Sequence, residues 1–199
     1  WGKKDPEVLE EAITAIRQET DQMSVLVENL LFIAKGETLK VTLQEAPFSM
    51  KELLEETAKD FSLSVPERQF LVEAEAFLVH QDRRLLKQLL RIFIDNSVKF
   101  TKDGGIIKLM AKKIHEGYVL SVCDDGEGIQ QEDLGHIFQR FYVGDKARTK
   151  DKAGSGLGLS IAKWIVETHE GVVEAVSAPM EGTTMRATFP SKALVKEER

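Results

Sequence analysis

The sequence predicts a two-layer α/β domain over residues 39–190, preceded by one long amphipathic helix. Two observations predict this fold class. Stretches in which apolar residues recur every three to four positions, the period of a helix, are interspersed with short stretches in which apolar and polar residues alternate, the period of a strand. The strand-like stretches after residue 105 also come in pairs joined by turn residues, and a sheet of this kind needs helices to cover one face.

The first helix is predicted from Asp5 to Lys35, with Pro6 tolerated in its first turn and Gly36 ending it. Its apolar stripe follows a four-three heptad formed by Leu9, Ile13, Ile16, Thr20, Met23, Val27, Leu30 and Ala34. A stripe of this width predicts a coiled coil or a four-helix bundle, with packing against the chain's own domain as the alternative. The abrupt start at Trp1, just before this helix, is typical of a chain cut from a longer protein.

The elements that follow are predicted from period and capping residues. In order they are a strand at 39–45, a helix at 49–63 capped by Ser49, strands at 70–75 and 77–80, a helix at 85–101 capped by Asp82, a hairpin of strands at 106–114 and 118–123, a helix from about 157, and a hairpin of strands at 172–177 and 183–189.

Composition narrows the possible partners. The chain has 199 residues, of which 42% are hydrophobic and 30% charged, and a net charge of -6. The most basic stretch, Lys146 to Lys152, is interleaved with acidic residues, so we expect no nucleic-acid partner. The single Cys123 excludes an internal disulfide and a thiolate metal site, and fits a reducing cytoplasm. The sequence shows no signal peptide and no apolar run near the roughly 20 residues that span a bilayer.

The helix at 85–101 carries the first candidate site. Helical spacing places Ile92, Asn96, Lys99 and Phe100 on neighbouring turns of one side. An amide oxygen can complete a Mg2+ shell made of water and phosphate oxygens, an ammonium can offset phosphate charge, and an aromatic ring can lie against a base or ribose. This combination suits a metal nucleotide, although a solvated helix end is the better explanation of these residues when they are taken alone.

A glycine-rich stretch, Asp124 to Ile129, follows the strand at 118–123. Gly126 and Gly128 allow the backbone to approach a ligand, and the strand-end carboxylate of Asp124 can accept a hydrogen bond from an amine such as adenine N6. A plain acidic turn is the alternative. A calcium loop is excluded, because the run lacks the alternating acidic or amide residues and the final Glu of an EF-hand.

The second glycine-rich stretch, Gly154 to Leu159, leads straight into a helix whose first amides can face phosphate oxygens. It is neither a Rossmann loop, because Leu159 occupies the last glycine position, nor a Walker loop, because the lysine is missing. Between the two stretches lie an aromatic clasp at Ile137 to Tyr142 and a charged segment, Val143 to Ala153, that we interpret as a mobile cover or an ordinary solvated loop.

Taken in order and spacing, five motifs together resemble the catalytic ATP-binding domain of a bacterial sensor histidine kinase, a branch of the gyrase, Hsp90, histidine kinase and MutL superfamily. They are RIFIDNSVKFT, DDGEGI, IFQRFY, GSGLGL and Gly182-Thr183-Thr184. The resemblance implies two domains: residues 1–36, similar to the second helix of the dimerisation and phosphotransfer hairpin, and residues 37–199, the catalytic ATP-binding domain with its two-layer α/β sandwich.

The resemblance also implies the site residues. Asn96 is expected to ligate Mg2+, Lys99 to meet phosphate as a second catalytic residue, and Asp124 to hold the adenine amine. The remaining ATP-binding residues that it implies are Phe100, Gly126, Gly128, Ile129, Phe141, Lys146, Arg148, Gly154, Ser155, Gly156, Leu157, Gly158, Leu159 and Thr184. Two positions depart from the family pattern: Ile92 stands where many relatives have Asn, and Val143 stands where Arg often follows the aromatic clasp, so Lys146 or Arg148 is expected to replace that cation.

The implied function is transfer of the γ-phosphoryl group of Mg-ATP to a histidine, for relay to an aspartate of a cognate response regulator. None of the four histidines, His80, His115, His136 and His169, has the family's phosphoacceptor context, so the acceptor is expected on a hairpin helix that is not in this chain. The implied partners are a second copy, through the helical hairpin, and the response regulator. A cytoplasmic location and a parent protein anchored upstream in a membrane are also implied. The alternatives are a serine kinase acting on a partner and a non-catalytic dimerisation module.

Overall fold

The computed structural model describes residues 8–10, 12, 13, 16, 20, 42–144 and 155–195. The chain divides into two compact units, residues 1–41 and 42–199. In the first unit the described residues are helical, and Thr20 Oγ1 donates to the carbonyl of Ile16 at 2.8 Å. Leu9, Ile13 and Ile16 of the predicted stripe are exposed. The rest of the predicted helix at 5–35 lies outside the described residues.

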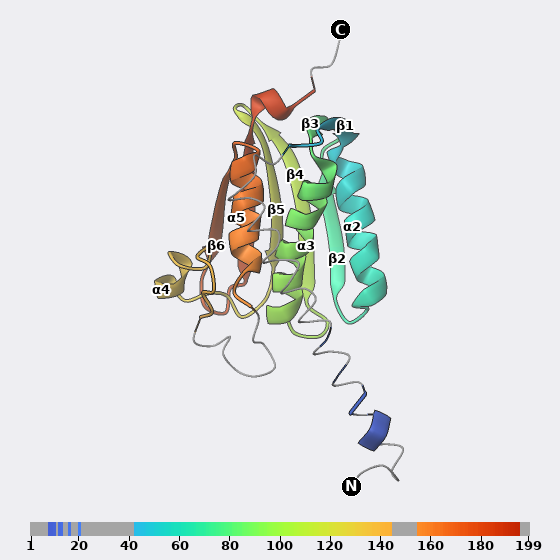
Figure 1. Cartoon of the computed structure of the whole chain (residues 1–199), viewed down its shortest axis with the longest axis vertical. Helices are drawn as coiled ribbons and strands as arrows, with labels where there is room; N and C mark the ends of the chain where they lie inside the picture. Colours follow the sequence, from blue (N-terminus) through green and yellow to red (C-terminus); the bar gives the residue numbers. More distant parts are fainter. Residues whose placement is uncertain are drawn as a thin grey trace. The chain divides into compact units, whose positions relative to one another are not determined.

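The second unit contains one main sheet and three long helices. Its elements are β1 (Ala46–Ser49), α2 (Met50–Ser64), β2 (Gln69–Ala74), β3 (Leu78–Gln81), α3 (Arg83–Phe100), β4 (Ile106–Ile114), β5 (Gly117–Asp124), α4 (Gln131–Leu134), α5 (Gly158–Thr168), β6 (Val172–Ser177), β7 (Thr183–Pro190) and the 3-10 turn η2 (Ser191–Ala193). Figure 1 shows α2, α3 and α5 side by side on one face of the sheet. The predicted two-layer α/β domain is therefore confirmed.

The main sheet has the strand order β2-β4-β5-β7-β6, in which β2 is parallel to β4 and all other neighbours are antiparallel. Side chains that point to the helices form the core, because strand residues alternate between the two faces. On this inner face the fully buried residues include Ile107, Leu109, Leu120, Val122 and Ala187. They meet the buried side of α3, which consists of Leu85, Leu86, Leu89, Leu90, Phe93, Ile94 and Ser97.

Local signals set the starts of two helices as predicted. Ser49 Oγ accepts from the amide of Glu52 at 3.2 Å and so caps α2. Asp82 Oδ1 accepts from the amides of Arg84 and Leu85 at 3.1 and 3.2 Å and so caps α3. Each cap satisfies helix-start amides that have no partner within the helix.

The strand predicted at 39–45 is wrong over its described part, since residues 42–45 have no regular structure and the strand begins at Ala46. The strand begins later because its pairing with β3 begins at Ala46. β1 forms a separate two-stranded sheet with β3, in a register that joins Ala46 to Gln81 and Ser49 to Leu78. The amide of Gln44 instead donates to Asp82 Oδ2 at 3.0 Å.

The N-terminus of α3 and the C-terminus of α5 meet at a buried junction. His169, which is 5% exposed, accepts through Nε2 from the amide of Asp82 at 3.4 Å. Its Nδ1 lies 2.8 Å from the carbonyl of Ile165 and therefore carries the proton. The His169 ring also meets the edge of Phe189 on β7, so this histidine ties two helices and the sheet together.

Near both ends of the described part of the second unit, the chain pairs with β3, once on each side of that strand. Phe48 of β1 pairs with Val79, and Leu194 forms an isolated bridge with the same residue. The amide of Val195 donates to the carbonyl of Leu78 at 3.0 Å. Throughout the described ranges, no helix is both long enough and apolar enough to cross a membrane.

Candidate functional site

The last turns of α3 carry the polar residues that the sequence singled out. Asn96 is half-buried, and its Nδ2 donates to the carbonyl of Ile92 at 2.8 Å. This bond uses the donor side of the amide, so Oδ1 is the atom that can serve a cation. Lys99 Nζ lies 5.3 Å from the centre of the Phe100 ring, and both side chains are half-buried. An amide oxygen, an ammonium and an aromatic ring are thus gathered at one helix end, as predicted.

Ile92 brings α5 to this helix end. A Cβ placed on Gly158, the first residue of α5, would lie 3.5 Å from Cγ2 of Ile92. The N-terminus of α5 therefore sits over the turn of α3 that precedes Asn96. The open amides of a helix N-terminus favour anions, so this packing places an anion-binding end near the candidate cation ligand.

Asp124 is the last residue of β5, and the residue is 7% exposed. Oδ1 accepts from the amides of Gly126 and Thr183, at 3.0 and 3.1 Å. Oδ2 accepts from Ser97 Oγ at 2.7 Å. Burial raises the pKa of this carboxyl above its ordinary value, and the three hydrogen bonds oppose that rise.

Two of these partners, Ser97 and Thr183, were not predicted. Ser97 directly follows Asn96 and lies on the buried side of α3, so helical spacing alone does not indicate its role. Thr183 was passed over in favour of Thr184. Strand alternation and register separate the two threonines: Thr183 pairs with Asp124, whereas Thr184 pairs with Cys123 and lies on the opposite face of the sheet from Asp124. Thr184 is therefore not brought together with the other candidate residues.

The loop after Asp124 packs closely against the end of α3. The amide of Glu127 donates to the carbonyl of Phe100 at 3.1 Å, which satisfies a helix-end carbonyl. A Cβ at Gly126 would come within 2.6 Å of the same oxygen, so only glycine fits there. The loop thus holds Asp124 and the polar end of α3 in a fixed relation.

The same loop is fastened on its other side to the turn between β6 and β7. Gly128 has a φ of +68°, and a Cβ there would lie 1.9 Å from the carbonyl of Ala178. The amide of Ile129 donates to Ser177 Oγ at 2.8 Å. Ser177 Oγ in turn contacts Thr183 Oγ1 at 3.0 Å. Gly126 and Gly128 therefore allow close approach of the loop to other backbone segments of the protein, whereas their predicted approach to a ligand stays a prediction.

The second glycine-rich stretch meets the aromatic clasp directly. The amide of Phe141 donates to the carbonyl of Gly156 at 3.0 Å. Gly156 has a φ of +68°, and a Cβ there would come within 2.6 Å of the Phe141 backbone. Phe141 has a φ of +60° and a side chain that is 64% exposed. At the entry to α5, Leu157 is fully buried, Leu159 is half-buried and Ser155 is exposed.

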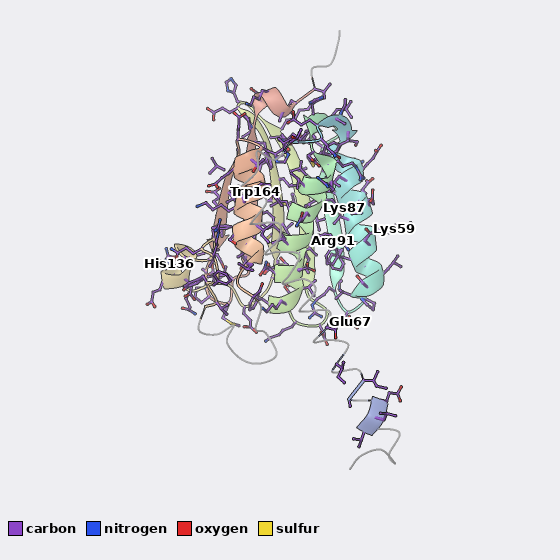
Figure 2. All side chains as sticks on the ribbon, viewed as in Figure 1. Lys59, Glu67, Lys87, Arg91, His136 and Trp164 are labelled. Atoms are coloured by element: carbon purple, nitrogen blue, oxygen red, sulfur yellow. The ribbon has the colours of Figure 1, made fainter. Side chains whose placement is uncertain are left out.

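Three predicted residues, Lys146, Arg148 and Gly154, lie outside the described residues. Their neighbour Val143 is half-buried. Before them, Tyr142 donates to Asp133, and its ring packs against His136 at 5.6 Å between ring centres. Figure 2 shows His136 beside the short α4, away from α3 and α5.

The other three histidines also lie apart from the candidate residues. His80 is exposed on β3, His115 is in the turn between β4 and β5, and His169 is buried at the far end of α5. Among the described residues, no three His, Cys, Asp or Glu side chains gather to hold a metal ion.

The sequence matches the family described as histidine kinase-, DNA gyrase B-, and HSP90-like ATPase over residues 81–193. The chain therefore belongs to this family of ATPases, and the resemblance drawn from its motifs is confirmed. The match runs from the end of β3 through η2 and so includes every described candidate residue.

Among curated proteins, the chain is similar to the sensor histidine kinase YkoH of Bacillus subtilis (strain 168), with 38% identity over 197 residues, 95% of this chain and 41% of YkoH. It is also similar to the signal transduction histidine-protein kinase ArlS of Staphylococcus epidermidis, with 33% identity over 96% of this chain and 42% of ArlS. The chain thus spans about two-fifths of the length of these relatives.

Solved structures agree with this assignment. ShkA in complex with AMPPNP has a TM-score of 0.80 at 26% identity, over 94% of this chain and 40% of ShkA. The histidine kinase ThkA in complex with the response regulator TrrA has a TM-score of 0.77 at 25% identity, over 96% of this chain and 54% of that one. The catalytic domain of ThkA alone has a TM-score of 0.65 and is covered to 98%.

Proposed function

We propose that this chain binds ATP with Mg2+ between the end of α3 and the two glycine-rich stretches, and presents the γ-phosphoryl group to a histidine on a hairpin helix outside this chain. The phosphoryl group then passes to an aspartate of a response regulator. The observation that carries the proposal is the buried carboxylate of Asp124 at the end of β5, held by three donors and facing the helix that carries Asn96.

The roles follow from the chemistry of each group. Asp124 accepts the adenine amine, because a buried carboxylate with a remaining lone pair is a strong acceptor. Asn96 would hold Mg2+ through Oδ1, and Lys99 offsets phosphate charge. Phe100 lies against the nucleoside, and the N-terminus of α5, starting at Gly158, faces the phosphates. Lys146 and Arg148 are further proposed phosphate contacts.

The transfer step needs the protein to position the reacting groups rather than to supply a reacting group of its own. A histidine nitrogen forms a bond to the γ-phosphorus while the bond from that phosphorus to the bridging oxygen breaks, and ADP leaves. The chain's part is to hold the nucleotide in line and to neutralise charge. Ile92 supports transfer over hydrolysis, since its side chain lies against Gly158 and offers no general base to activate water.

The proposed partners follow from the first unit and from the relatives. The exposed apolar residues Leu9, Ile13 and Ile16 fit a helical hairpin that pairs with a second copy. The printed title of the ThkA complex names a response regulator bound to a protein of the same fold. We accordingly propose residues 1–36 as the second hairpin helix and residues 37–199 as the catalytic ATP-binding domain.

Calorimetric titration with Mg-AMPPNP tests nucleotide binding. Asp124→Asn is expected to weaken binding about tenfold or more, because the amide can present a donor where the adenine amine needs an acceptor. Asp103→Asn is the matched control, since Asp103 pairs with Arg68 at the exposed turn before β4. Equal affinity for wild type and Asp124→Asn would remove Asp124 from the adenine site.

Incubation with γ-labelled ATP tests phosphoryl transfer. The 199-residue chain is expected to stay unlabelled, while the chain extended upstream through the first hairpin helix is expected to acquire acid-labile, base-stable phosphate. Asn96→Ala should abolish that label. A label on the 199-residue chain that His136→Ala or His80→Ala removes would show that an acceptor lies among its own four histidines.

A further inference from the structure

The hydrogen bonds of Asp124 leave one acceptor position open. A carboxylate has about four lone-pair positions. The amides of Gly126 and Thr183 take both positions of Oδ1, and the hydroxyl of Ser97 takes one position of Oδ2. The remaining position of Oδ2 can therefore accept a single N–H group from a ligand.

The bond from Ser97 is a specific use of that hydroxyl. A serine inside a helix commonly donates to a carbonyl of the preceding turn. Ser97, which is 2% exposed, instead donates across 27 residues of sequence to Asp124 Oδ2 at 2.7 Å. A hydroxyl that donates to a buried carboxylate stabilises the ionised form of that carboxylate.

The surroundings of Asp124 otherwise favour protonation. Burial is the largest influence and raises the pKa, and the neighbouring charge of Asp125 raises it further. The bond from Ser97 is the strongest of the three hydrogen bonds that lower the pKa. On α3 the charged residues flanking Ser97 are Asp95 and Lys99, and Thr183 of β7 contributes no charge.

We propose that Ser97 is a positioning residue that keeps Oδ2 of Asp124 a pure acceptor and thereby sets a preference for 6-aminopurine over 6-oxopurine nucleotides. The inference rests on the proposed function, in which Asp124 meets the base. An ionised carboxylate binds the 6-amino group and repels a 6-oxo oxygen, whereas a protonated carboxyl can donate to that oxygen. Selectivity for the base thus depends on Asp124 staying ionised, which the hydrogen bond from Ser97 favours.

The test measures the affinity ratio of ADP to IDP by calorimetry between pH 5 and pH 8. The ratio cancels the titration of the phosphates, because both nucleotides share it. In wild type the ratio is expected to stay high down to lower pH than in Ser97→Ala. In Ser97→Ala the ratio is expected to fall about tenfold between pH 8 and pH 5, the size of effect that loss of one charge-assisted hydrogen bond produces.

Ser121→Ala is the matched control, because Ser121 is a buried serine on the same strand as Asp124 and is not one of its hydrogen-bond partners. It should keep the wild-type ratio at every pH. Ser97→Cys has a weaker donor, so its affinity ratio of ADP to IDP should lie between those of wild type and Ser97→Ala. This variant replaces Ser97→Ala in the test if the alanine variant does not fold.

Carbon NMR of the Asp124 carboxyl in the nucleotide-free protein separates the two proposals. Its pKa should be higher in Ser97→Ala than in wild type. An unchanged pKa, or an ADP to IDP ratio that moves equally with pH in both proteins, contradicts the role of Ser97. Failure of wild type to bind either nucleotide overturns the proposed function as well, while the carboxyl titration still reports the bond between Ser97 and Asp124.

Discussion

Asp124 is almost completely buried and can carry a negative charge, and burial of a charge usually lowers the stability of a fold. Its pKa in the folded chain is raised above the ordinary value, chiefly by burial. The folded state therefore binds more protons than the unfolded state at pH values between the ordinary pKa and the raised one. The free energy of unfolding must then decrease as the pH rises through this window, so ionised Asp124 weakens the fold at neutral pH.

Asp124→Asn is accordingly expected to raise the free energy of unfolding at pH 7 while it lowers nucleotide affinity. The amide can fit the site, since its oxygen can accept from the amides of Gly126 and Thr183 and its nitrogen can donate to Ser97 Oγ. Urea denaturation at pH 4 to 8 measures this. The variant should lose the part of the pH dependence that wild type shows above pH 4, and a destabilised variant at pH 7 would contradict the argument.

Gly156 and Gly158 give a second prediction, because they stand two residues apart in different backbone conformations. Gly156→Ala is expected to destabilise the domain by about 1–3 kcal/mol, since it combines a positive φ with a Cβ contact of 2.6 Å to the Phe141 backbone. Gly158→Ala begins a helix with ordinary contacts and should be neutral or stabilising by up to about 1 kcal/mol. Urea midpoints for the two variants, compared with wild type, measure the difference.

The candidate residues divide according to the range of the information that places them. Asn96, Lys99 and Phe100 share one helix, so spacing alone predicts that they gather. The role of Ser97 cannot be predicted without the position of Asp124, which is 27 residues away and on a strand. The predicted contact is Thr184, but Thr183 is the threonine that lies beside Asp124. The face of the sheet on which each threonine lies depends on the register between β7 and β5, and no local signal sets that register.

The site depends on helices α3 and α5, and α3 contacts both ends of α5. Near the site, Ile92 of α3 lies against Gly158 of α5. From Ile92, about three turns of α3 lead back to its N-terminus, where His169 links the end of α5 to the amide of Asp82. This arrangement holds the polar end of one helix and the amide end of the other at a constant separation.

His169→Leu is expected to destabilise the domain by about 1–3 kcal/mol, because it leaves the buried amide of Asp82 without an acceptor while nearly keeping the side-chain volume. His80→Leu is the matched control, and its exposed site on β3 should change stability by less than about 0.5 kcal/mol. Thermal unfolding of both variants provides the comparison. Similar melting temperatures for the two would show that the junction contributes little.

Element prediction succeeded where the signals are local. The start of α2 and the start of α3 follow from Ser49 and Asp82, and the turn at residues 115–116 separates β4 from β5. It failed at 42–45, where alternation was present but no strand among the described residues pairs with this segment, since pairing is a property of the whole sheet. The four-residue α4 and the short η2 are too brief for a period to be recognised.

At the scale of the whole molecule, residues 42–199 form a compact unit with its own buried core. We expect residues 42–195 to fold alone and to bind Mg-AMPPNP with an affinity within about threefold of the full chain, because every described candidate residue lies within them. Calorimetry on both chains measures this. A much weaker affinity for the shorter chain would mean that residues 1–41 contribute to the site. The solved catalytic domain of ThkA, covered to 98% by this chain, shows that such a unit can be studied separately.

The bridge between Val79 and Leu194 has a consequence for how such a domain is combined with others. Since Phe48 and Leu194 flank the same strand, the described part of the unit begins and ends near one place. A unit with adjacent ends can be spliced into a longer polypeptide, or joined end to end and reopened elsewhere, without stretching its fold. The pairing at β3 thus makes the described part of this unit suitable for insertion into a longer polypeptide without changes to its interior.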